Sequence, residues 1–149
     1  MQNRFYPNTI TPFENEPTKQ DFEFRNLGNS IGLAVFSKRQ FQKGEVVFRF
    51  TGLITDTITQ HSLQISADQH IHDPWFMGFV SHRCEPNCWV DMKRLEFIAT
   101  SSINNADRIT MNYNQTEHVL FRSFRCDCGE TMCQNTDQKQ IRGQPPNQG

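Results

Sequence analysis

The chain has 149 residues and a formal net charge of −1, which is enough sequence for one domain with a single sizeable core. This charge balance implies no strongly basic face, so direct binding of nucleic acid through its phosphates is not expected. No apolar run approaches the roughly 20 residues that a membrane span needs, and the first residues lack the apolar segment of a secretory signal. We therefore expect an intracellular protein, cytoplasmic or, in a eukaryote, nuclear. In such a reducing compartment, clustered cysteines more often bind a metal than form disulfides.

The chain divides by composition into an arm, a region of short strands and a tail. Residues 1–20 are rich in proline, asparagine and threonine, which predicts an arm without regular structure. Residues 135–149 contain almost nothing apolar and predict a disordered tail. Between them, alternating or apolar runs separated by turn signals predict a mostly β fold. The expected strands are 21–25, 31–36, 45–50, 53–54, 63–65, 95–100 and 109–113, with one helical turn within 75–80.

Three cysteines near the C-terminal end stand at Cys-x-Cys-x4-Cys spacing: Cys126, Cys128 and Cys133. A structural zinc site needs four ligands in tetrahedral geometry, so a fourth must come from elsewhere in the chain. The candidates are Cys84, Cys88 and a histidine, with Cys84 preferred. Unrelated reduced thiols are the alternative, and the tight spacing argues against it. Such a zinc ion would stabilise a segment that has little core of its own.

Four blocks of sequence stand in order along the chain: 32–36 with 42–47, 50–52, 79–87 and 108–113. The third is similar to a Phe-x-Asn-His-Ser-Cys-x-Pro-Asn signature, and the fourth is similar to a Glu-Leu-Thr-Phe-Asp-Tyr block. Together they resemble, in order, the blocks of the SET-domain methyltransferases that carry a post-SET zinc segment.

The resemblance implies a SET-domain fold of several short sheets over residues 21–120, followed by a post-SET zinc segment at 121–134. In this fold the fourth block threads beneath the loop around the third, which forms a pseudoknot.

The resemblance also implies a site that binds S-adenosylmethionine on one face and admits a lysine side chain from the other. Tyr113 matches the channel tyrosine, so it is the expected catalytic residue and also a cofactor contact. The other expected cofactor contacts are Gly32, Leu33, Ala34, Ser81 and His82, and Phe50 is expected at the substrate channel. One structural zinc ion is expected on Cys84, Cys126, Cys128 and Cys133, with Cys88 as the spare thiol.

Several positions depart from the family's pattern, and three of them at the expected cofactor and lysine sites leave three functions open. Ala34 replaces the second glycine of Gly-x-Gly, Ser81 replaces the signature asparagine, and Phe50 replaces the tyrosine of Tyr-x-Gly. The first function is methyl transfer from S-adenosylmethionine to a protein lysine. The second is a non-catalytic, zinc-stabilised SET module that binds cofactor or a partner, and the third is a SET-scaffold enzyme that acts on a small molecule. The expected partner is thus a protein or small-molecule methyl acceptor, without direct nucleic acid or a membrane, while the arm would cover the channel or mediate a homodimer.

Overall fold

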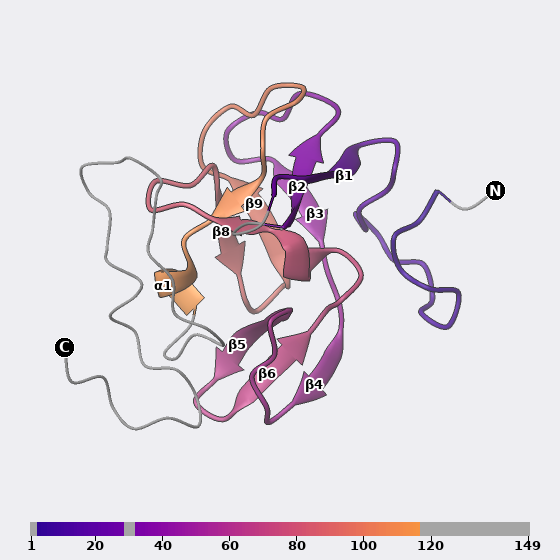
Figure 1. The fold of residues 1–149 in the computed structure, drawn as a ribbon, viewed down its shortest axis with the longest axis vertical. Coiled ribbons are helices and arrows are strands. Elements are labelled where there is room, and N and C mark those ends of the chain that lie inside the picture. Colours follow the sequence, from indigo (N-terminus) through magenta and orange to yellow (C-terminus); the bar gives the residue numbers. More distant parts are fainter. Residues whose placement is uncertain (1–2, 29–31, 117–149) are drawn as a thin grey trace.

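The computed structural model describes residues 3–28 and 32–116 of the chain. The predicted zinc segment 121–134, with Cys126, Cys128 and Cys133, and the predicted tail 135–149 lie outside the described residues. Within them, ten short strands, one 3-10 turn and one short helix follow one another (Figure 1). In chain order these are β1 (Phe22–Asn26), β2 (Leu33–Ser37), β3 (Val46–Arg49), β4 (Leu53–Thr55), β5 (Ser62–Ser66), β6 (Gln69–His72), η1 (Met77–Phe79), β7 (Ser81–His82), β8 (Cys88–Asp91), β9 (Glu96–Ala99), β10 (Thr110–Met111) and α1 (Tyr113–Thr116).

The described strands form four small sheets instead of one large one. β1 and β2 form an antiparallel hairpin, and β7 and β10 form a two-residue parallel pair. Two antiparallel sheets have three strands each, in the orders β3–β9–β8 and β4–β6–β5. In Figure 1 the β4–β6–β5 sheet lies at the lower end of the molecule, and the other strands lie above it. This arrangement confirms the predicted mostly β fold of several short sheets.

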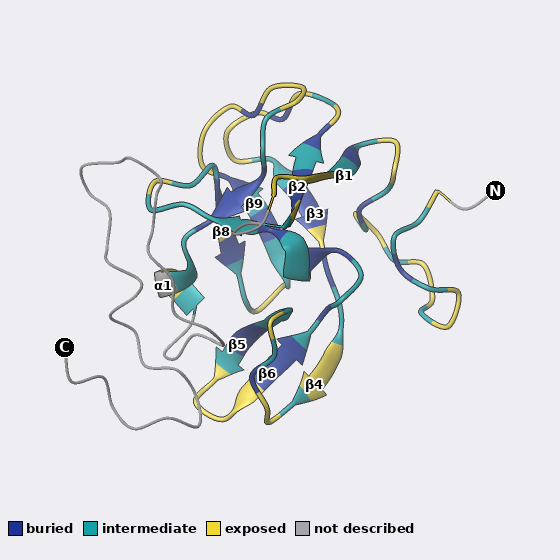
Figure 2. Ribbon diagram, in the orientation of Figure 1, coloured by how far each residue is buried: buried dark blue, intermediate teal, exposed yellow. Residues whose placement is uncertain are grey.

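The core that joins β1, β3 and β9 is built on phenylalanine rings and lies at the centre of Figure 2. Phe48 of β3 stacks on Phe97 of β9 with ring centroids 4.4 Å apart, and Phe76 meets Phe48 edge-on at 4.8 Å. Phe22 of β1 stacks on Phe41 at 5.7 Å. Aromatic pairs at such separations contribute about 0.5–1.5 kcal/mol each beyond the burial of their surface. Each of these small sheets is too small to form a core alone, and the rings therefore hold the sheets together.

The described part of the N-terminal arm packs on this core, although it contributes no strand to the four sheets. The Tyr6 side chain is buried, and the ring of Phe5 lies 4.7 Å from that of Phe76. Arg4 donates to both carboxylate oxygens of Glu16, at 2.7 and 3.1 Å, which closes the arm on itself. The arm is thus held to the domain by buried side chains.

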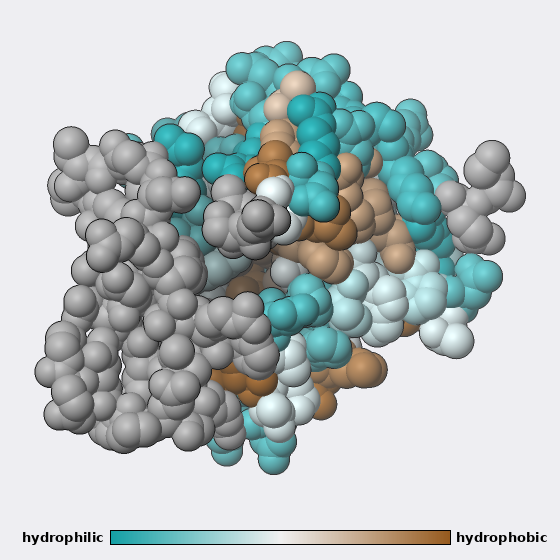
Figure 3. All heavy atoms as spheres, in the orientation of Figure 1, coloured by the Kyte–Doolittle hydropathy of each residue, from teal (hydrophilic) through white to brown (hydrophobic). Residues whose placement is uncertain are grey.

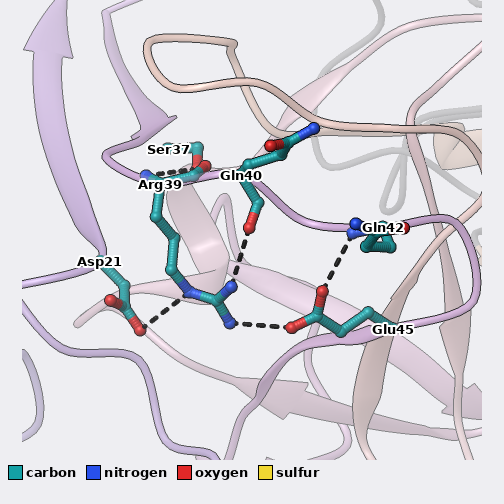
Figure 4. A network of polar contacts seen from close by, with 6 residues as sticks. All are labelled: Asp21, Ser37, Arg39, Gln40, Gln42 and Glu45. Atoms are coloured by element: carbon teal, nitrogen blue, oxygen red, sulfur yellow. Dashed lines mark hydrogen bonds and ion pairs between the residues drawn. The ribbon is translucent and has the colours of Figure 1, made fainter.

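Arg39 fastens the connection between β2 and β3 to the start of β1 (Figure 4). Its guanidinium donates to Glu45 at 3.0 Å, and its Nε lies 3.6 Å from a carboxylate oxygen of Asp21. The same guanidinium lies 3.8 Å from the centroid of the Phe41 ring. The N–H of Gln42 donates to the Glu45 carboxylate, and this bond, together with Arg39, holds the pKa of Glu45 below its usual range. Arg39 and Glu45 therefore brace the connection that leads into β3.

Hydrophobic side chains reach the surface at β4. Leu53 and Ile54 are 60% and 56% exposed, and Figure 3 shows hydrophobic atoms near the lower edge of the molecule, where Figure 1 places this strand. β4 lies at the edge of its sheet and pairs with β6 alone among the described strands. Neither helical segment of the described residues has the length and hydrophobicity that crossing a membrane requires.

Candidate functional site

The site begins where two distant segments of the chain meet in a parallel pair. Ser81 and His82 of β7 lie in register with Thr110 and Met111 of β10, and the N–H of Arg83 donates to the Met111 carbonyl at 2.9 Å. Parallel strands need a long connection, and here the chain travels through β8 and β9 before it returns. The third and fourth sequence blocks, which the expected pseudoknot joins, therefore lie side by side.

Asn87 locks the same two blocks together through its side-chain amide. Its Nδ2 donates to the Arg108 carbonyl at 2.8 Å, and its Oδ1 accepts from the Thr110 N–H at 2.9 Å. The Asn87 N–H donates in turn to the Thr110 hydroxyl oxygen at 3.0 Å. Both polar ends of the amide are thus paired with the backbone of the fourth block. This arrangement explains why an asparagine stands at the end of the signature.

The fourth block also pairs with β2, which carries the first expected cofactor contacts. The N–H of Ile109 donates to the Val35 carbonyl at 2.8 Å, next to Ala34. Ala34 is fully buried, so it presents no exposed surface to a ligand. Gly32 and Leu33 lie at the end of the β1–β2 hairpin, where Leu33 is 41% exposed and a Cβ on Gly32 would meet no atom within 4 Å. Gly32 has a φ of +74°, a conformation that residues with side chains rarely adopt.

His82 is the centre of the described site. The backbone N–H of Tyr113 donates to His82 Nδ1 at 3.0 Å, and Cys84 Sγ lies 3.4 Å from His82 Nε2. The His82 and Tyr113 rings pack at a centroid separation of 5.1 Å. The structure therefore brings together Tyr113, His82 and Cys84, which the sequence assigned to catalysis, cofactor binding and metal binding.

The Tyr113 hydroxyl is oriented by the backbone. It donates to the Val80 carbonyl at 2.8 Å, at the residue before β7. The side chain of the preceding residue, Asn112, donates to the Cys84 carbonyl at 3.3 Å. Because its hydrogen is committed to Val80, the hydroxyl oxygen of Tyr113 presents lone pairs to any further partner.

Phe50, the residue expected at the substrate channel, lies within the aromatic core. It is 1% exposed, and its ring contacts Phe97 at a centroid distance of 5.5 Å. A polar group of the arm reaches this block, because the N–H of Thr51 donates to the Tyr6 hydroxyl at 3.3 Å. The sequence did not single out Tyr6.

Asp73, which the sequence did not single out either, holds the turn that precedes the third block, residues 79–87, which we call the signature loop. Its carboxylate accepts from the N–H groups of Trp75, Phe76 and Met77 at 2.9, 2.9 and 3.2 Å. It is fully buried, and burial raises the pKa of this carboxyl above its ordinary value, against the opposing effect of its hydrogen bonds. An aspartate followed by proline, just before a helical turn, is the pattern of an N-cap and could have been recognised.

The two described cysteines differ in their fitness as metal ligands. Cys84 is half-buried, and its sulfur meets an imidazole nitrogen. Cys88 is fully buried in the hydrophobic core, and burial raises the pKa of its thiol to about 12. Since a metal binds the thiolate, Cys84 is better suited than Cys88 to act as a metal ligand. Within residues 3–28 and 32–116 no group of three potential ligand side chains comes together, and the other three predicted ligands lie outside these residues.

A hollow of about 250 Å³ lies beside the signature loop. Its lining includes Arg83 and Arg108 as well as Glu85 and Asp107. The two signs of charge offset one another, so the hollow offers no strong field of one sign to a charged ligand.

Comparison with known proteins identifies the fold of this site. The chain matches the family model of the SET domain over residues 32–114. It is 31% identical over 111 residues to the Variant-silencing SET domain-containing protein of Plasmodium falciparum, an alignment that covers 68% of this chain and 4% of that protein. It is 23% identical over 126 residues to the Histone-lysine N-methyltransferase, H3 lysine-36 specific, of Candida albicans, covering 68% of this chain and 15% of that protein. The chain thus spans only a small part of the length of either relative.

Solved structures share the architecture at low sequence identity. KRYPTONITE in complex with mCHH DNA, H3(1-15) peptide and SAH superposes with a TM-score of 0.62 at 21% identity, covering 78% of this chain and 29% of that one. The methyltransferase domain of human Histone-lysine N-methyltransferase SETMAR gives a TM-score of 0.62 at 14% identity, covering 80% of this chain and 59% of that one. These likenesses establish the fold.

Proposed function

This chain belongs to the SET-domain family, and from that premise we propose that it transfers a methyl group from S-adenosylmethionine to the side-chain amine of a protein lysine. The observation that carries the proposal is the position of Tyr113 at the β7–β10 pair, with its hydroxyl oriented by Val80 and its ring against His82. The names of the relatives support the reaction, since one is a histone-lysine N-methyltransferase. The KRYPTONITE complexes contain SAH, and one of them also contains an H3(1-15) peptide.

The reaction asks mainly for positioning. When bound, S-adenosylmethionine supplies a sulfonium methyl group that an amine lone pair displaces in line. The lysine amine must arrive neutral, although its unperturbed pKa is about 10.4. A dry channel lowers that pKa, and correct alignment of the amine lowers the barrier.

Tyr113 is the residue proposed to orient the amine. Its phenolic hydrogen is committed to the Val80 carbonyl, so its oxygen can accept an N–H from the neutral amine. Accepting one N–H leaves the nitrogen lone pair to point elsewhere, toward the methyl donor. No strong general base is needed, because the product ammonium can lose its proton to water.

The cofactor contacts are proposed at two places. Gly32 and Leu33, at the end of the hairpin, are proposed to contact the methionine end, where Leu33 is 41% exposed. The N–H and carbonyl of Gly32 are bonded to Gly28 and Leu27 within the hairpin, so Leu33 offers the more accessible contact. Ser81 and the backbone of His82, both in β7, are proposed to contact the rest of S-adenosylmethionine. Ala34 is fully buried, so its proposed contact rests on the resemblance alone. Phe50, buried in the core, is proposed to bound the channel as an apolar wall that lacks a hydroxyl.

One zinc ion is proposed as a structural part of the same site. Cys84 would supply one thiolate, and Cys126, Cys128 and Cys133 would supply the others. A closed site of four thiolates has no open position, so the metal would stabilise the fold and take no part in methyl transfer.

The second candidate is a non-catalytic SET module that binds cofactor or a partner. The burial of Ala34 and Phe50 favours it, because two positions that the family pattern assigns to the site present almost no surface to a ligand. A SET-scaffold enzyme that acts on a small molecule differs from the first proposal only in its acceptor.

Two measurements separate these candidates. Native mass spectrometry should show S-adenosylmethionine bound to the protein, and a labelled methyl donor should modify lysine in a peptide library. Tyr113→Phe should lower turnover by about 10²-fold while cofactor binding persists, and Ser101→Ala, at an exposed position, is the matched control. Cofactor binding without any methylated acceptor would favour the module. Absence of binding at millimolar cofactor would overturn both enzyme proposals.

A further inference from the structure

We propose that His82 is a positioning residue that joins the zinc thiolate of Cys84 to Tyr113 through its two ring nitrogens. In this arrangement Nδ1 accepts the Tyr113 N–H and Nε2 donates its hydrogen to Cys84 Sγ. The proposal rests on the zinc site of the proposed function and adds a role that the sequence did not suggest, because the sequence predicted that His82 contacts the cofactor and packs the pseudoknot.

The partner of Nδ1 fixes the tautomer of the His82 ring. A backbone N–H can only donate, so His82 Nδ1, 3.0 Å from the Tyr113 nitrogen, must present a lone pair. A neutral imidazole with its lone pair on Nδ1 carries its hydrogen on Nε2. The hydrogen bond to Tyr113 therefore assigns the tautomer.

The hydrogen on His82 Nε2 faces the sulfur of Cys84. Cys84 Sγ lies 3.4 Å from His82 Nε2, within reach of an N–H···S hydrogen bond. Cys84 follows two residues after His82, just beyond the end of β7, where its sulfur reaches the imidazole ring. A thiolate is a better acceptor than a thiol, and donors of this kind hold and tune metal ligands from outside the coordination sphere.

The other ring nitrogen, His82 Nδ1, holds the backbone at the start of α1. Tyr113 is the first residue of α1, and the first N–H groups of a helix have no partner within it. His82 Nδ1 supplies that partner, and its ring packs on the Tyr113 ring at 5.1 Å. A shift of Cys84 when metal is lost would therefore be transmitted to the residue that carries the proposed catalytic hydroxyl.

Two substitutions separate the two bonds. In His82→Asn, the amide oxygen can still accept the Tyr113 N–H, but no donor reaches Cys84. In His82→Gln, the longer side chain can place an N–H near Cys84, but the acceptor for Tyr113 is lost. The pair thus removes one bond at a time without introducing a charge.

The readouts are zinc release to a chromogenic chelator and hydrogen exchange of the Tyr113 amide by NMR. His82→Asn should release zinc about tenfold faster than the parent protein, as expected for loss of an outer-shell partner, and should keep Tyr113 protected. His82→Gln should release zinc at nearly the parent rate and lose the protection of Tyr113. Both variants behaving like the parent protein would overturn the proposal.

A measurement on the unaltered, zinc-loaded protein decides the matter even if a variant fails to fold. A two-bond proton–nitrogen NMR spectrum should show His82 with a protonated Nε2 and an unprotonated Nδ1, and the opposite tautomer would refute the arrangement. These readouts need no methyl acceptor. A protein that binds zinc, shows the predicted pattern and transfers no methyl group would lose the proposed activity and keep this inference, whereas a protein that binds no zinc would lose the inference.

Discussion

The Tyr6 hydroxyl donates a hydrogen bond of 2.5 Å to Asp73 Oδ2, although the two residues lie 67 positions apart. Both side chains are buried, and the same hydroxyl accepts the N–H of Thr51 at 3.3 Å. Because Asp73 also accepts the N–H groups of Phe76 and Met77, this single contact ties the N-terminal arm to η1, the element that leads into the third block. The arm is thus part of the folded unit that presents the site.

Removing the Tyr6 hydroxyl should destabilise the domain. Tyr6→Phe keeps the ring but leaves Asp73 with one donor fewer and removes the hydroxyl that accepts the Thr51 N–H. Leaving buried polar groups unsatisfied costs about 1–3 kcal/mol each, so urea unfolding should show a loss in that range. Leu53→Ala, at an exposed position, is the control. A Tyr6→Phe protein as stable as the parent would contradict the buried bond.

The stability of the domain should carry a pH dependence that originates at Asp73. Burial raises the pKa of its carboxyl in the folded state, so the folded protein holds this proton more tightly than the unfolded chain does. The stabilising contribution is therefore complete below the ordinary aspartate pKa of about 4 and is lost as pH rises through the raised value. The stability of the parent protein relative to Asp73→Asn should fall with increasing pH between these values. Urea unfolding of both proteins across this range checks the sign, and a rising difference would contradict it.

Gly52→Ala should be one of the more damaging single-methyl changes. A Cβ at Gly52 would lie 2.3 Å from the His72 carbonyl oxygen, in the backbone of β6, where little adjustment is available. We expect a loss of about 3 kcal/mol, as for severe overpacking. Gly44→Ala is the matched comparison, since its Cβ meets nothing within 4 Å and only its φ of +88° is unfavourable, a cost of about 1–2 kcal/mol. Thermal or urea unfolding should rank the two in this order, and equal losses would contradict the steric argument.

Cys88 should resist thiol reagents until the domain unfolds. Burial raises the pKa of its thiol to about 12, so at pH 8 only about one molecule in 10⁴ carries the thiolate at this position. In chelator-treated protein, Cys84 should be alkylated under native conditions, while Cys88 reacts only in denaturant. Peptide mapping by mass spectrometry distinguishes the two, and native alkylation of Cys88 would show that this part of the core opens readily.

The sequence predicted the strands whose pattern is local. Alternation marked β1 and β9, and an apolar run marked β3, so all three were expected near their observed positions. β6 was missed because its sequence, Gln-His-Ile-His, is largely polar, and it is a strand because β4 and β5 pair with it on both sides. The predicted strand 109–113 ends early, since Tyr113 begins α1 once its N–H bonds to His82.

The same distinction applies to the site. The two-residue spacing of His82 and Cys84 would put them on one face only within a strand, and Cys84 lies beyond the end of β7, so spacing alone does not predict their contact. The contacts of His82 with Tyr113 and of Tyr6 with Asp73 join segments that no periodicity relates. They depend on the tertiary path of the chain, and neither composition nor spacing carries that information.

The parallel β7–β10 pair also sets the order in which the molecule can be completed. The β1–β2 and β5–β6 pairs are local, so they can form as soon as their own residues are available. β7 has no partner until the chain through Met111 has been made, and the long loop between the two strands must then close at an entropic cost. During synthesis, Ser81 and His82 of β7 therefore have no strand to pair with until the residues that follow β9 have been made. We therefore expect the site to be the last part of the described domain to take shape, so substitutions in the 108–113 block should speed unfolding more than they slow folding.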